Sequence, residues 1–124
     1  MPFVFNRQIE TYEVDVFESS SLNYDRAIRL NLPASGGNPA HLVSIEFPPV
    51  PPADYVNIGA SFTTVQMPAS RFDALYHILQ TESPVFFTAY EVPFGSTMLR
   101  FVGVSSDSEA TGEGFRDADT LAGP

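Results

Sequence analysis

The chain has 124 residues and a formal charge of −9, with 15 acidic side chains, six arginines and neither lysine nor cysteine. The missing cysteines exclude disulfides, thiol nucleophiles and cysteine-ligated metals, and the missing lysines exclude Schiff-base catalysis and P-loop phosphate binding. The acidic excess repels the phosphates of nucleic acids and of anionic membranes, so we expect neither as a partner.

The first half of the chain alternates apolar and polar residues with period two, the pattern of strands that have one wet face. This pattern predicts four strands, at residues 8–18, 25–32, 41–47 and 55–66. Serines and Asn23 between the first two strands favour a hairpin. The proline-rich run Pro48–Pro52 cannot join a sheet ladder and predicts an extended connection, whereas Gly59 indicates a bulge in the fourth strand.

One helix is predicted between Ser70 and about Glu82. Its apolar stripe recurs at positions i, i+3, i+4 and i+7 and consists of Phe72, Leu75, Tyr76 and Leu79. Ser70 is the expected N-cap, with Asp73 at the capping-box position, and Pro84 ends the helix. The stripe indicates that the helix lies on one face of a sheet.

Two further strands, at residues 84–92 and 96–105, are apolar on both faces, which is typical of central strands covered on two sides. Residues 92–95, Val-Pro-Phe-Gly, predict the turn between them. The order of elements is then β-β-β-β-α-β-β. It predicts an α+β fold, with a mainly antiparallel sheet or a small, partly open barrel of about six strands and one helix packed on it.

Residues 1–105 are expected to form a single α+β domain, because the length and the 44% hydrophobic content suit one core. Residues 106–124 carry no apolar pattern and contain five acids and one arginine, which predicts an acidic C-terminal tail. The amino-terminal residues lack a signal-peptide pattern, and no apolar run is long enough to cross a bilayer. We therefore expect a cytoplasmic protein.

Few side chains could support catalysis or hold a cofactor. Asp73 and His77 are four residues apart on the helix, and with His41 they would make the two-histidine, one-carboxylate set of non-haem iron sites. A helical wheel, however, directs Asp73 and His77 to solvent, away from the apolar stripe. Glu13 and Asp15 share one strand face, as any alternating strand allows. We expect no catalytic residue, no metal and no cofactor.

The apolar residues exceed what one helix and one sheet face can cover, which favours contact with another protein. The leading interpretation is a non-catalytic protein-interaction or assembly module that associates with itself or is a small subunit of a larger complex. Its candidate interface residues, drawn from the chain termini and the last two strands, are Phe3, Phe5, Phe86, Tyr90, Met98 and Phe115.

Two alternatives belong to other functional classes. A small barrel closed by the helix could carry or sense a small apolar ligand. The cavity for that ligand would be lined by Phe62, Tyr76, Phe87 and Phe101. The third hypothesis is an enzyme that uses His41, His77 and neighbouring carboxylates.

Overall fold

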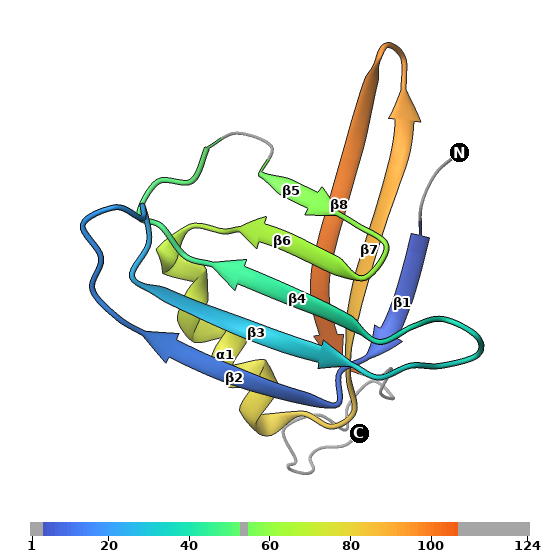
Figure 1. Cartoon of the computed structure of the whole chain (residues 1–124), viewed down its shortest axis with the longest axis horizontal. Helices are drawn as coiled ribbons and strands as arrows, with labels where there is room; N and C mark the ends of the chain where they lie inside the picture. Colours follow the sequence, from blue (N-terminus) through green and yellow to red (C-terminus); the bar gives the residue numbers. More distant parts are fainter. Residues whose placement is uncertain (1–3, 53–54, 107–124) are drawn as a thin grey trace, which may run out of the picture.

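The computed structural model describes residues 4–52 and 55–106, which form two sheets and one α-helix (Figure 1). The elements are β1 Val4–Gln8, β2 Thr11–Val16, β3 Arg26–Leu32, β4 His41–Glu46, β5 Val56–Ile58, β6 Phe62–Gln66, a 3-10 turn at Ala69–Arg71, α1 Phe72–Thr81, β7 Val85–Phe94 and β8 Thr97–Ser106. The predicted α+β class with one helix packed on a sheet is confirmed. The described residues contain more strands than the six predicted.

The larger sheet has five strands in the order β2-β3-β4-β6-β5. The predicted hairpin of β2 and β3 is confirmed, with antiparallel pairing from Thr11↔Asn31 to Val16↔Arg26. β6 pairs in parallel with β4 and antiparallel with β5, so this sheet is mixed. After β4 the proline-rich connection carries the chain to the sheet edge, where β5 forms and turns back. The returning strand, β6, therefore runs in the direction of β4.

The single strand predicted at residues 55–66 is wrong, because the chain turns within it. The backbone N–H of Gly59 donates to the carbonyl of Phe62 at 3.0 Å, which closes the turn between β5 and β6. A Cβ atom at Gly59 would lie 2.6 Å from the same carbonyl oxygen. Gly59 therefore marks a tight turn and not the predicted bulge.

Gly59→Ala is expected to lower the free energy of unfolding by about 1–3 kcal/mol, because the added methyl group collides with backbone and not with a movable side chain. Chemical denaturation measures this loss. Gly103→Ala is the matched control, since a Cβ there would meet no atom within 4 Å. Equal losses in the two variants would contradict this account of the turn.

The smaller sheet has the order β1-β7-β8. The sequence did not predict β1, whose five residues alternate weakly. This strand pairs with β7 from Val4↔Tyr90 to Gln8↔Phe86.

The hairpin of β7 and β8 is confirmed, but its turn lies two residues later than predicted. Phe94 pairs with Thr97, and the first of the two loop residues is Gly95 at φ 63°. Ser106, assigned to the predicted tail, ends β8, and the rest of that tail lies outside the described residues.

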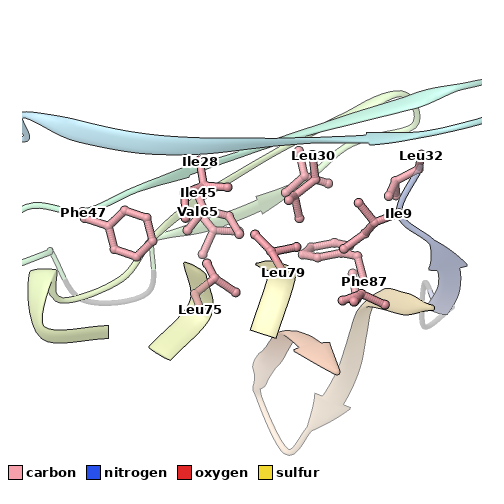
Figure 2. Close-up of a cluster of buried hydrophobic side chains, with 13 residues drawn as sticks. Ile9, Ile28, Leu30, Leu32, Ile45, Phe47, Val65, Leu75, Leu79 and Phe87 are labelled. Carbon is pink, nitrogen blue, oxygen red and sulfur yellow. The ribbon is translucent and has the colours of Figure 1, made fainter. Parts of the chain in front are cut away.

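The hydrophobic core lies between the five-stranded sheet, α1 and β7. It includes Ile28, Leu30, Ile45 and Val65 from the sheet, Leu75 and Leu79 from α1, and Phe87 from β7 (Figure 2). Alternate residues of β7 are buried here, which leaves the other face of the hairpin outside this core. The prediction that the last two strands are covered on both faces is therefore wrong for the described residues: Leu99 is 37% exposed and Phe101 is 45% exposed.

The start of the helix also differs from the prediction. Ser70 lies in the 3-10 turn, α1 begins at Phe72, and Arg71 before it makes no side-chain capping bond. An N-cap residue needs an extended backbone, which Ser70 cannot adopt inside a turn. Asp73 is still in the first turn of α1, where a carboxylate is favourable to the helix dipole.

Candidate functional site

The two sheets differ in the faces that they turn away from the core. In the smaller sheet, Val85, Phe87 and Ala89 are buried, so the outer face is the opposite one. Side chains alternate between the two faces along each strand, and the pairing register shows which residues of β1, β7 and β8 share the outer face. We call it the neutral face. Its described side-chain positions are Asn6, Gln8, Phe86, Thr88, Tyr90, Val92, Leu99, Phe101, Gly103 and Ser105. None of these positions carries a charge, although the whole chain has a formal charge of −9.

A stacked aromatic pair stands at the middle of the neutral face. Tyr90 and Phe101 are directly opposite each other across the hairpin, with ring centroids 4.9 Å apart and an angle of 27° between the ring planes. Phe101 remains 45% exposed, and Leu99 on the same strand is 37% exposed. The pair therefore presents apolar surface to solvent.

The neutral face is open beside this pair. Gly103 lies two residues beyond Phe101 and opposite Thr88. A Cβ atom built at Gly103 would meet no atom within 4 Å. The hydroxyl of Thr88 donates to the side-chain oxygen of Asn6 at 3.2 Å, so these two polar side chains are hydrogen-bonded to each other on the neutral face.

The charges of the hairpin lie on its other side. Arg100 Nε donates to Glu91 Oε2 at 2.8 Å, between residues that are directly opposite in the register. The register places this ion pair in the half of the hairpin nearer its turn. The turn end of β7 and β8 extends beyond the five-stranded sheet (Figure 1). Because both charges point away from the neutral face, that face stays uncharged along the described length of the hairpin.

The outer face of the five-stranded sheet has the opposite character. Arg29 Nη2 lies 3.2 Å from Glu13 Oε2 and also contacts the carboxylate of Asp15. Glu46 accepts a hydrogen bond from Gln66 at 2.8 Å. We call the side of the sheet that bears these residues the charged face. Glu13 and Asp15, which the sequence places on one face, are both ion-pair partners of Arg29.

His41 lies in the core at 2% exposure. Its Nε2 is 2.7 Å from Thr63 Oγ1, and its Nδ1 is 3.2 Å from the carbonyl oxygen of Ala60. Since a carbonyl can only accept, Nδ1 carries the proton and Nε2 accepts from the threonine hydroxyl. Burial lowers the pKa of His41, and the nearby Arg7 adds to this effect. Both ring nitrogens are engaged in holding strands together.

The structure does not gather the residues considered for a metal site. His41 is buried on β4, whereas Asp73 and His77 are exposed on α1. Within the described part of the chain, no group of three histidine, cysteine, aspartate or glutamate residues is placed to hold a metal ion.

Of the four residues proposed to line a ligand cavity, two belong to the core region and two lie on outer sheet faces. Phe87 is in the core, and Tyr76 on α1 packs against Phe72 and Tyr12. Phe62 is 47% exposed at the start of β6, and Phe101 is on the neutral face. Phe62 and Phe101 are on outer faces of different sheets, so the four side chains do not surround one space.

The proposed interface residues divide between the two sides of the small sheet. Phe86 and Tyr90 are on the neutral face. Phe5 packs inward, with its ring centroid 4.9 Å from that of His41 and 5.9 Å from that of Phe87. Met98 lies in β8 opposite Pro93. Phe3 and Phe115 are outside the described residues.

The interface residues selected from the sequence do not include Val92 or Leu99, and Phe101 was assigned to the alternative cavity. The signal that could have found them is strand parity, because residues an even number of positions apart share a face. The observed turn lies two residues after the predicted one, so the pairing of β8 with β7 shifts by an even number of residues. An even shift keeps every side chain on the same face of the hairpin. Both turns place Phe101 on the face of Tyr90.

No protein-family model matches the chain, and no curated protein or solved structure was found to match it. Among the described segments, no helix has the length and apolar character needed to cross a bilayer.

Proposed function

We propose that this chain is a non-catalytic protein-interaction module and that the neutral face is its contact surface. The observation that carries the proposal is an uncharged sheet face with exposed Leu99 and Phe101 on a chain of formal charge −9. The buried centres of protein interfaces are depleted of charged residues and enriched in aromatic ones. The stacked pair of Tyr90 and Phe101 supplies such a centre.

The cost of removing water distinguishes the two outer sheet faces. Covering the charged face would desolvate Arg29 and its two carboxylate partners, and the penalty for burying such ions can exceed the attraction between them. Covering the neutral face removes water mainly from apolar side chains and gains about 25 cal/mol per Å² of apolar area. The neutral face is therefore the better contact surface.

The hairpin that presents this face is held in shape before any partner arrives. Ten residue pairs join β7 to β8, and Arg100 is bonded to Glu91 behind the neutral face. Gly95 closes the two-residue loop with a positive φ of 63°, which glycine adopts without strain. A partner that binds a preorganised surface loses less conformational entropy.

A photoreactive benzoylphenylalanine introduced at Leu99 tests the proposal in the native cells. We expect light-dependent adducts with protein from this position, because it lies on the neutral face. The same side chain introduced at Phe62, which is 47% exposed on the outer side of the five-stranded sheet, is the control and should give none. Equal yields from both positions, or no adduct from position 99, would refute the proposal.

A further inference from the structure

We infer that the partner of the neutral face is the neutral face of a second copy of this chain, packed against it about a two-fold axis. This inference rests on the proposed function and names the partner. Three observations support it. The described face carries no charge, the exposed Phe101 lies beside the open space at Gly103, and the area of the face suits a weak dimer.

Charge decides between the candidate occupants. Two copies of formal charge −9 repel each other, and the repulsion is weakest where the touching surfaces carry no charge. Residues 107–124 of the same chain contain five acids and one arginine, and the described neutral face offers no cation to pair with those acids. An acidic segment would therefore lose solvation there without compensation, whereas a second neutral face would not.

The shape of the face is complementary to itself. Phe101 projects into solvent at 45% exposure, and Gly103, two positions along the same strand, leaves open space. Consecutive residues on one face of a strand are about 7 Å apart. The two-fold axis lies in the plane of the interface, runs perpendicular to the strands and passes over Val102 of β8. This axis places each Phe101 over Gly103 of the other copy. The same axis places each Tyr90 over the other Thr88, since these residues are opposite Phe101 and Gly103 in the register.

The size of the face predicts a weak dimer. β7 and β8 have ten residues each and β1 has five, so the face covers roughly 400 Å² by the standard strand rise and spacing. Two copies then bury on the order of 800 Å², the size of a weak or transient contact. We expect a dissociation constant of about 1–100 μM and a monomer in dilute solution.

Sedimentation equilibrium of the full chain over this concentration range tests the inference. Phe101→Ala removes the projection and Gly103→Leu fills the opening, and each should weaken dimerisation at least about thirtyfold. The Cβ of Gly103→Leu would meet no atom within 4 Å, so we expect the monomer to stay folded, and chemical denaturation of the variant checks this. Phe62→Ala removes a phenylalanine of similar exposure, 47%, from the other sheet and should leave the dimer unchanged.

Salt gives an independent readout. Added NaCl screens the repulsion between two acidic copies, so it should leave the dissociation constant unchanged or lower it. A dimer that weakens several-fold with salt would be held by ion pairs, and this would overturn the inference.

Other outcomes also contradict the two-fold dimer. A wild-type chain that stays monomeric at about 100 μM, or a dimer that survives Gly103→Leu, would overturn it. So would a photo-cross-link from position 99 to residues 107–124 of the same chain. Adducts from position 99 with a different protein, and none with a second copy, would overturn the dimer while leaving the proposed function standing. No protein adduct at all would remove both.

Discussion

Phe87→Ala is expected to lower the free energy of unfolding by about 3–5 kcal/mol, the usual range for deleting a buried aromatic ring. Phe87 is fully buried, and its ring centroid lies 5.9 Å from that of Phe5. It belongs to the core cluster that joins β7 to α1 and to the five-stranded sheet (Figure 2). Its removal leaves a cavity at the junction of the two sheets. Urea or guanidinium denaturation measures the loss.

Phe101→Ala in dilute solution is the control for this experiment. Phe101 belongs to the same hairpin but is 45% exposed, and its ring stacks on that of Tyr90. An aromatic pair of this kind contributes about 0.5–1.5 kcal/mol. A loss in Phe101→Ala as large as that in Phe87→Ala would show that the two faces of the hairpin have been assigned incorrectly.

A second large effect is expected from pH. Burial lowers the pKa of His41 below its usual value of 6.5, so the folded protein favours the neutral ring. The unfolded chain takes up this proton first as the pH falls. The contribution of His41 to stability is therefore complete above pH 6.5 and is lost as the pH decreases toward the pKa of the folded state. In this window the free energy of unfolding should fall by up to about 1.4 kcal/mol per pH unit.

His41→Gln isolates this contribution. The glutamine amide cannot titrate, so we expect the part of the slope that His41 contributes below pH 6.5 to disappear. At pH 7.5 the variant should be about 1–3 kcal/mol less stable than the wild type, because Ala60 and Thr63 lose well-placed partners. His77→Gln replaces an exposed histidine of α1 and is the matched control for the substitution itself. An unchanged slope in His41→Gln would assign the pH dependence to other groups.

The elements that local pattern could predict are those whose signal lies within one segment. The apolar stripe of α1 led correctly to Leu75 and Leu79 as buried residues, because helical periodicity is visible in ten residues. Alternation likewise predicted β2, β3 and β4. β1 and the separation of β5 from β6 could not be found in this way, since a five-residue strand and a three-residue strand are too short to show a period.

The candidate surface was predictable only in part. Phe86 and Tyr90 could be selected from the sequence, because they lie in an apolar strand. Their separation from Phe87 follows from alternation alone. The sequence could not predict on which side of the small sheet Phe5 lies, because this side depends on the pairing of β1 with β7. That pairing turns Phe5 inward, against His41.

The sequence by itself determined the fold class, the helix, the final hairpin and the exclusion of lysine and cysteine chemistry, because these follow from composition and from periodicity within single segments. The tertiary structure decided that the strands divide into two sheets, that β6 lies parallel to β4, and that Phe87 is buried while Phe101 is exposed. Both sides of an apolar hairpin look alike in sequence. The side that becomes core is the one that α1 and the larger sheet cover, and their position depends on contacts between segments far apart in the chain.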